Sequence, residues 1–301
     1  TSLRCGRRMA PGAPLAQAPG RRNLAGTMKL PFFDKSPRVA VIRLSGVIAA
    51  RTGGFSPTGI SAAGMAPLIE RAFSLKRLAG VVLAINSPGG SPVQSSLVAQ
   101  RIRRLADEKG VPVIAVVEDA AASGGYWLAC AADEIVVDPA SVVGSIGVIS
   151  AGFGLEDAIE RYGVHRRLHT AGTEKSFLDP FSPEKPEDVE RLRGLLGELH
   201  EVFRAWVRAR RAGKLTVPED ELFTGRFWTG QRAVELGLAD RIGEVSSEVK
   251  KRFGEEAKAV VIGQRRPPWP VRLLPIPSGA ELAEGVLGAL EERAAWARVG
   301  L

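Results

Sequence analysis

The stretches GVVLAINSPGGS (residues 80–91) and PVIAVVEDAAASGGYWLACAA (residues 112–132) decide the fold of this chain. Each begins with a continuous apolar run of strand length, which predicts a strand buried on both faces. Each then reaches a turn rich in small residues, and a helix is expected to follow. Buried strands that alternate with helices predict an α/β fold with parallel pairings.

The same alternation extends outward from these two segments. Strands are predicted at 39–48 and 134–138, and helices at about 61–76 and 92–107. The second helix is expected to turn four apolar side chains inward, namely Val93, Leu97, Ile102 and Leu105.

Beyond residue 155 the sequence becomes more helical. Strands are predicted at 164–170 and 258–262, and a short helix at 230–238. A longer helix is expected to begin at Pro186, because proline suits the first helical position. Its apolar residues form one stripe over about six turns, which indicates a helix that faces the core or another subunit. The stripe consists of Val189, Leu192, Leu196, Leu199, Phe203, Trp206 and Val207.

Composition places the chain among globular proteins. Hydrophobic residues make up 45% and charged residues 25% of its 301 residues, which argues against bulk disorder. Residues 1–27 hold five arginines and no acid, so they carry +5 of the net charge of +8. The rest is only mildly basic and lacks a basic stripe with interleaved aromatic residues, so no nucleic-acid partner is expected. No apolar run approaches the roughly 18 residues of a membrane span.

Several kinds of site lack their motifs. The sequence has no phosphate-binding loop, no dinucleotide-binding glycine pattern and no H-E-x-x-H pair. Cys5 and Cys130 give neither a disulfide framework nor zinc-ligand spacing. His165, His169 and His200 have no cysteine or carboxylate cluster beside them, so surface or packing roles are favoured and no metal is expected.

Ser123 lies where a predicted buried strand gives way to a helix, between small residues on both sides. Small neighbours allow the sharp turn that exposes the hydroxyl of a nucleophilic serine. The first N–H groups of the helix could stabilise an oxyanion. From this segment alone, a serine that merely caps the helix is the favoured interpretation.

The segment NSPGGS (86–91) forms a second turn of the same kind. Pro88 and Gly89 suit the centre of a type II turn, in which glycine supplies the positive φ. Bare N–H groups of the glycine pair could hold an oxyanion, a peptide or a phosphate, although an ordinary tight turn is the alternative. Two such turns in one α/β layer favour a shared site at the strand ends.

Four spaced motifs give the chain a family resemblance. NSPGGS (86–91), AASGGYW (121–127), VGSIGV (143–148) and A-G-x-x-K-S (171–176) follow one another, and residues 223–243 resemble a signature at the end of the domain. In this order, over residues 39–243, the motifs resemble the signal peptide peptidase A family of serine proteases, of the ClpP/crotonase superfamily. The resemblance implies a single copy of a spiral of ββα units followed by long helices.

The resemblance also implies the site. Ser123 would be the nucleophile and Lys175 the general base of a Ser-Lys dyad. The N–H groups of Gly90 and Gly124 would form the oxyanion hole, and Ser145 would hydrogen-bond the lysine amine. No cofactor is implied. The family suggests a ring-like homo-oligomer, with an octamer as one expected size, in which serine and lysine of neighbouring protomers meet.

A lysine base needs a dry environment. A free lysine has a pKa of about 10.4 and is charged at neutral pH, so only burial makes it a base. Phe177 and Leu178 could supply an apolar wall for Lys175. Glu174 departs from the family, which more often has an aromatic residue there, and a nearby carboxylate would favour the charged amine. In an extended segment, however, adjacent side chains point to opposite faces.

The expected function is therefore a serine endopeptidase that hydrolyses extended hydrophobic peptides such as released signal peptides. The alternatives are a crotonase-like acyl-CoA hydratase or isomerase with a glutamate base, and a scaffold that binds peptides without cutting them. The domains are expected to be a basic tail (1–27), a peptidase domain (28–264), and a linker with an amphipathic helix (265–301). A cytoplasmic location is expected, with membrane contact through the tail or the last helix.

Overall fold

Parallel strand pairing organises the part of the chain that the structure, a computed structural model, describes. The described residues are 1, 36–50, 59–172, 174–263, 289–290 and 292–301. The chain divides into two units, Thr1–Lys35 and Ser36–Leu301, and all the elements below belong to the second. The predicted break at 265–270 and almost all of the predicted tail lie outside the described residues. The predicted domain boundaries stay predictions.

One eight-stranded sheet forms the centre of the described residues. Its main path runs β6-β5-β3-β2-β1-β8, β4 pairs with β3, and β7 pairs with β4. All of these pairings are parallel except the antiparallel pair β5–β6. The strands are β1 (Arg38–Ser45), β2 (Leu78–Ser87), β3 (Val113–Ala122), β4 (Glu134–Val137), β5 (Val142–Gly144), β6 (Phe227–Thr229), β7 (Arg241–Ile242) and β8 (Lys258–Ile262). The predicted α/β class is confirmed.

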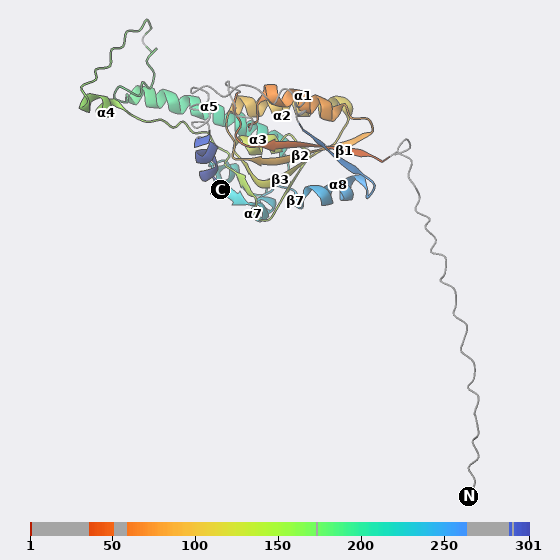
Figure 1. Ribbon diagram of the computed structural model, residues 1–301. Coiled ribbons are helices and arrows are strands. Elements are labelled where there is room, and N and C mark those ends of the chain that lie inside the picture. Colours follow the sequence, from red (N-terminus) through yellow and green to blue (C-terminus); the bar gives the residue numbers. More distant parts are fainter. Residues whose placement is uncertain (2–35, 51–58, 173, 264–288, 291) are drawn as a thin grey trace. The chain divides into compact units, whose positions relative to one another are not determined.

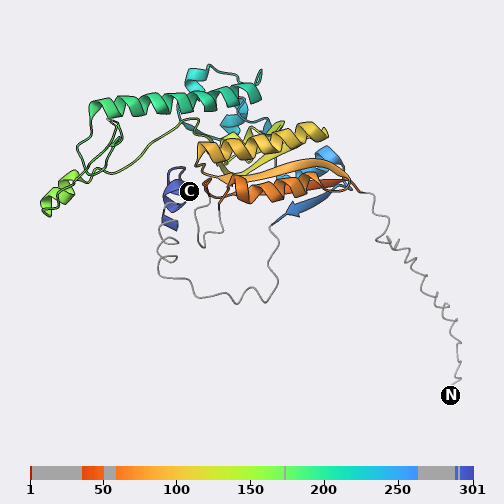
Figure 2. The same ribbon diagram turned by 90° about the horizontal axis from the view of Figure 1, so that it is seen from above.

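Helices cover both faces of the sheet. They are α1 (Ala62–Phe73), α2 (Pro92–Lys109), α3 (Gly124–Ala129), α4 (Glu156–Arg161), α5 (Pro186–Arg210), α6 (Glu219–Leu222), α7 (Gly230–Glu235) and α8 (Val245–Phe253). The helices α1 and α2 pack side by side on one face, and α8 covers part of the other (Figures 1 and 2). Among the described residues, none of the helices combines the length and the apolar character needed to cross a bilayer.

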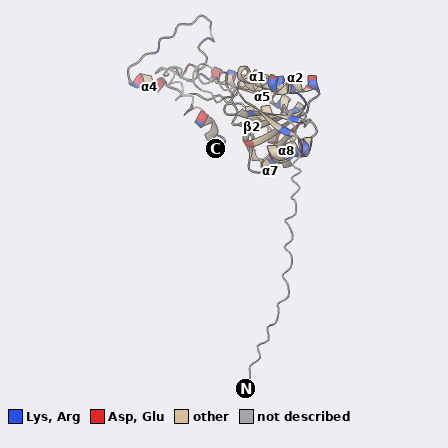
Figure 3. Cartoon of the chain, turned by 45° about the vertical axis from the view of Figure 1, so that its right-hand side comes forward, with Lys and Arg blue, Asp and Glu red and all other residues tan. Residues whose placement is uncertain are grey.

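Local signals fix the ends of α1 and α2. The Ser61 hydroxyl accepts a hydrogen bond from the Gly64 N–H at 3.1 Å and so caps α1, the helix predicted at about 61–76. Pro92 occupies the start of α2, and Gly110 ends it in the left-handed conformation with φ 60°. Basic and acidic residues both occur along α2 (Figure 3), and Arg104 pairs with Glu108 one turn later at 2.7 Å.

Two predictions are wrong: the buried face of α2 and the strand at 164–170. Val93 and Leu97 are 60% and 47% exposed, because small residues at Ser95 and Ala99 let α2 turn a different face toward the sheet. Residues 164–170 form no strand, and every one of them is exposed. Alternating side chains do not make a strand where no neighbouring strand supplies hydrogen bonds.

The apolar stripe of α5 is buried only near its end. Phe203 and Val207 are buried, whereas the stripe residues Leu192, Leu196 and Leu199 remain partly exposed. The second half of α5 packs on α3: the rings of Trp127 and Phe203 stack with their centroids 4.8 Å apart. The first half of α5 therefore has an apolar side that the protomer does not bury.

Candidate active site

The two glycine-rich turns meet at the carboxyl ends of β2 and β3. These strands are parallel neighbours, and Ser87 pairs in register with Ala121. A Cβ atom placed on Gly89 would lie 2.8 Å from the Ser123 Cβ. Gly89 has φ 104°, the positive value predicted for the turn. The fold thus brings the two sequence segments into contact at the strand ends, as expected for a site in an α/β sheet.

Ser123 has a strained backbone and a hydroxyl that does not cap the helix. Its φ of 50° and ψ of −117° lie outside the regions that a residue with a side chain favours. Ser123 stands at the cap position of α3, but its side chain makes no capping hydrogen bond, so the cap interpretation is wrong. Backbone bonds hold the residue instead: its N–H donates to Gly144 O at 2.8 Å, and its carbonyl accepts from Trp127.

The amides of Gly90 and Gly124 lie beside Ser123. A Cβ placed on Gly124 would be 3.3 Å from the Gly90 nitrogen. Within the described ranges, neither amide has a hydrogen-bond acceptor. A developing oxyanion is the kind of acceptor that two free, fixed N–H groups stabilise.

Ile48 fixes the Gly90 turn. The Ile48 N–H donates to Gly89 O at 2.8 Å, and its carbonyl accepts from the Ser91 N–H at 2.7 Å. A Cβ on Gly90 would lie 2.0 Å from the Ile48 oxygen, and the φ of Gly90 is 142°. Only glycine fits this position. No local sequence signal points to Ile48, because its contact depends on the Gly90 turn lying against it.

Ser145 lies in a turn that is bonded to the backbone of Ser123. Its predecessor Gly144 accepts the Ser123 N–H, and Ser145 itself donates its N–H to Arg226 O at 2.7 Å. His200 of α5 has its Nε2 3.0 Å from the Ile146 oxygen, so it supports the same turn. This contact gives His200 a structural role that the sequence did not specify.

Lys175 lies apart from Ser123 within the protomer. It is exposed, and its neighbour Glu174 pairs with Arg191 in the first half of α5 at 2.7 Å. The helix α3 instead contacts α5 near Phe203, which is twelve residues further along. At 1.5 Å per residue these contacts are about 18 Å apart along the helix axis. The structure groups Ser123, Gly90, Gly124 and Ser145, and does not bring Lys175 to them.

The structure also differs from the prediction that Phe177 forms an apolar wall for Lys175. The Phe177 ring lies under the Arg191 guanidinium, with 6.0 Å between the ring centroid and Cζ. The Glu174 carboxylate is bound to the same guanidinium. Arg191 was not singled out from the sequence, since nothing in the sequence indicates that α5 passes beside this segment.

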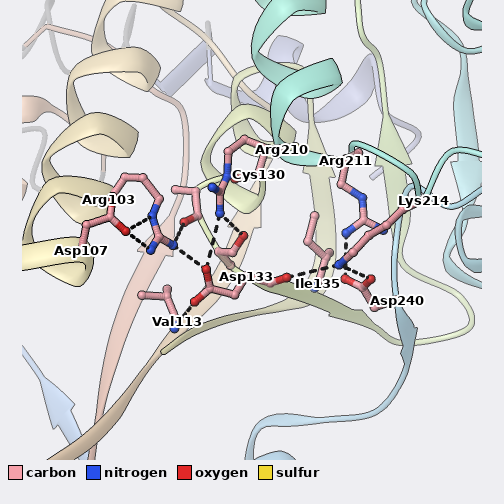
Figure 4. A network of polar contacts seen from close by, with 12 residues as sticks. Arg103, Asp107, Val113, Cys130, Asp133, Ile135, Arg210, Arg211, Lys214 and Asp240 are labelled. Atoms are coloured by element: carbon pink, nitrogen blue, oxygen red, sulfur yellow. Dashed lines mark hydrogen bonds and ion pairs between the residues drawn. The ribbon is translucent and has the colours of Figure 1, made fainter. Parts of the chain in front are cut away.

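Behind the candidate site, α3 is packed rigidly. Tyr126 is fully buried and donates its hydroxyl to Leu238 O at 2.8 Å, so its role is in packing. Burial raises the pKa of the Cys130 thiol to about 12, which leaves it uncharged at neutral pH. Figure 4 shows the polar network that includes Cys130, in which Arg211 and Lys214 both bind Asp240. Arg211 also donates to Gly237 O at 2.9 Å.

Comparison with known families decides the class of protein. Residues 106–259, just over half of the chain, match the model of peptidase family S49. The chain belongs to this family. The resemblance to signal peptide peptidase A is therefore confirmed, and with it the ClpP-like α/β fold class.

Relatives of this S49 chain are longer than it is. A protein of Brucella abortus named Na(+)/H(+) antiporter NhaA is 47% identical over 282 residues, which are 90% of this chain and 38% of that protein. The chloroplastic serine protease SPPA of Arabidopsis thaliana is 35% identical over 216 residues, 70% of this chain and 31% of that protein. Protease 4 of Haemophilus influenzae is 31% identical over 226 residues, which are 74% of this chain and 35% of that protein. The chain thus spans 31–38% of these relatives.

Among solved structures, a serine-to-alanine mutant of a membrane-bound stomatin-specific protease aligns with a TM-score of 0.47 and 15% identity. The alignment covers 76% of this chain and 98% of that one.

Proposed function

We propose that this S49 protein is a serine endopeptidase in which Ser123 is the nucleophile and Lys175 the general base. The observation that carries the proposal is the strained backbone of Ser123, whose hydroxyl does not cap α3 and which adjoins two unpartnered amides. Backbone strain of this kind gathers at functional sites. The hydroxyl of a serine with only a capping role would instead accept a hydrogen bond from an N–H group in the first turn of the helix.

The proposed reaction is acyl transfer to water. The neutral Lys175 amine takes the proton of the Ser123 hydroxyl as its oxygen attacks the peptide carbonyl carbon. The Gly90 and Gly124 N–H groups then donate to the oxyanion, each contributing about 3 kcal/mol as such donors do elsewhere. Lys175 next protonates the leaving amine. Water, deprotonated by the same lysine, hydrolyses the acyl-enzyme and restores the serine.

Lys175 is proposed to come from a neighbouring copy. A lysine base must be dry, whereas Lys175 is exposed in the protomer. The segment before it also exposes large apolar side chains: Ile149 is 68%, Phe153 86% and Tyr162 82% exposed. A homo-oligomer, such as the expected ring, would cover these side chains. Its interfaces would unite Lys175 of one copy with Ser123 and Ser145 of the next, and Ser145 would hold the amine.

The proposed substrates are extended hydrophobic peptides such as released signal peptides. Val93 and Leu97 are exposed in the first turns of α2, directly after the Gly90 turn. Apolar side chains in this position would favour aliphatic residues near the cleaved bond.

The test is hydrolysis of a hydrophobic peptide by the wild type, Ser123→Ala, Lys175→Ala and the control Lys109→Ala, which changes an exposed lysine at the end of α2. Loss of either dyad member is expected to lower kcat by at least about 1,000-fold, while the control keeps full activity. Equal activity of all four proteins would refute the dyad.

A fluorophosphonate probe separates the alternatives. It is expected to label the wild type at Ser123, because it reacts with activated serines. A hydratase or a peptide-binding scaffold has no nucleophile there, so an unlabelled Ser123 in a correctly assembled protein would speak for one of those classes.

A further inference from the structure

Glu174 stands directly before the proposed base, and this inference therefore rests on the proposed function. An ionised carboxylate within about 4–6 Å of an amine favours the charged amine by one to three pH units. A protonated Lys175 could not accept the proton of Ser123. Residues 174–178 form a turn and not the extended segment expected, so opposite faces of a strand do not separate the Glu174 carboxylate from the Lys175 amine, and the chain needs another means of doing so.

Arg191 contacts the segment on both sides of Lys175. Its Nη2 lies 2.7 Å from Glu174 Oε1, and its Cζ lies 6.0 Å from the centre of the Phe177 ring. Its Nη1 also bonds Asp188, one turn earlier on α5, at 3.2 Å. The guanidinium is thus fixed to α5 while it holds the residues that precede and follow the lysine.

Two other carboxylates near this segment, those of Asp179 and Asp188, are paired as well. Asp179 binds Arg166 at 3.1 Å, and the Phe181 N–H together with Arg166 holds the pKa of Asp179 below its ordinary value. Asp188 is held by Arg191. Among the described residues, no ion pair is formed by the Lys175 amine, whereas the carboxylates of Glu174, Asp179 and Asp188 each have an arginine partner.

We infer that Arg191 is a positioning residue that binds the Glu174 carboxylate and so withholds it from the Lys175 amine. In the protomer this exposed ion pair is worth little. Once a second copy excludes water from the interface, charges interact more strongly, and an unpaired Glu174 would hold Lys175 in its charged form. The pair with Arg191 cancels that field and leaves the lysine able to lose its proton.

The experiment compares pH–rate profiles of the full chain in its assembled form. The proteins are wild type, Arg191→Gln, Glu174→Gln, the double variant, and the control Arg193→Gln, an exposed arginine on the same helix. Arg191→Gln is expected to move the acid-side midpoint of kcat/KM upward by about one pH unit, a loss of about tenfold at neutral pH. Adding Glu174→Gln is expected to restore the midpoint, because this second substitution removes the carboxylate that Arg191 no longer binds.

The double variant separates electrostatics from structure. If Arg191→Gln lowers activity equally at every pH and Glu174→Gln does not restore it, Arg191 only holds the segment and the inference is wrong. An unchanged midpoint also overturns it. Arg191→Lys, which keeps the positive charge, is expected to retain the wild-type midpoint even if Arg191→Gln assembles poorly. Full activity of Lys175→Ala would instead refute the proposed function itself.

Discussion

At the scale of single residues, the candidate site depends on backbone conformations that most residues avoid. The sparsely populated backbone conformation of Ser123, with φ 50° and ψ −117°, costs about 1–3 kcal/mol. Two backbone hydrogen bonds hold Ser123 in place: its N–H donates to the Gly144 carbonyl, and its own carbonyl accepts from the Trp127 N–H. The neighbouring turn is constrained by contact, since Gly90 lies against the Ile48 carbonyl. The strained Ser123 therefore stands at the start of α3 with a hydroxyl that makes no capping hydrogen bond to that helix.

The two left-handed glycines at Gly90 and Gly110 give a matched prediction. In Gly90→Ala the new Cβ would meet the Ile48 oxygen at 2.0 Å, so the turn must move and its amide leaves the site. Activity is expected to fall by at least about 100-fold, the effect of losing one oxyanion donor. Gly110→Ala has open space around its Cβ and should cost about 1 kcal/mol of stability through its φ alone.

Peptide hydrolysis and urea unfolding of both variants check this expectation. Gly110→Ala is the control, because Gly110 ends α2 at the opposite end from the site. Wild-type turnover by a folded Gly90→Ala protein would mean that the Gly90 amide takes no part in the reaction.

At the scale of elements, local sequence was enough to predict a strand where an uninterrupted apolar run is buried on both faces. The apolar runs predicted β2 and β3, and the helices predicted at about 61–76 and 92–107 match α1 and α2 within a few residues. The placement of Ser123 beside Gly90 followed, because the ends of parallel strands share one edge. Patterns failed where long-range contacts decide: Val93 and Leu97 are exposed since α2 packs through smaller residues.

The long helix α5 shows the limit of such predictions most clearly. Its apolar stripe was compatible with core or interface, and the structure buries only the part near Phe203. Neither the Arg191 contact with Glu174 nor the His200 contact with Ile146 follows from helical spacing, because both partners lie far away in sequence.

Asp240 binds groups that follow α5 and a group that lies in β4, and its ionisation gives a prediction for the stability of the fold. Burial disfavours its charge, but hydrogen bonds from Arg211, Lys214 and the Ile135 N–H outweigh this and lower the pKa of Asp240. Between the unfolded value of about 3.9 and the lower folded value, the unfolded chain binds more protons. The contribution of Asp240 is therefore complete above pH 4 or so and is lost as pH falls through the folded pKa.

Asp240→Asn is expected to lower the free energy of unfolding at pH 7 by about 3 kcal/mol, because Arg211 is only 2% exposed and loses its counter-ion. The variant should also show a weaker loss of stability on acidification below pH 4 or so. Urea unfolding at both pH values, at one protein concentration, checks this. The control is Asp220→Asn in α6, which changes an exposed aspartate. Equal acid sensitivity of Asp240→Asn and the wild type would contradict the assignment.

At the scale of the whole molecule, the proposed dyad is divided between two regions of the protomer. Ser123 is fixed by β3, β5 and the second half of α5, whereas the Lys175 segment is held by Arg191 in the first half. The family resemblance names both residues and implies that neighbouring protomers supply them, but the residue pattern by itself does not indicate which copy supplies each. The exposed apolar side chains of Ile149, Phe153 and Tyr162 supply the physical reason for a second copy.

Mixed assemblies test this division directly. Ser123→Ala and Lys175→Ala proteins are each expected to be inactive alone. When they are dissociated together and reassembled, a site can combine Ser123 from one variant with Lys175 from the other. Random mixing makes this combination at about a quarter of the sites, so about a quarter of the wild-type activity should return. A dyad within one protomer has no intact site in any mixture and returns none. Each variant reassembled with itself is the control, and size-exclusion chromatography verifies that mixed and unmixed samples reach the same assembly state before peptide hydrolysis is measured.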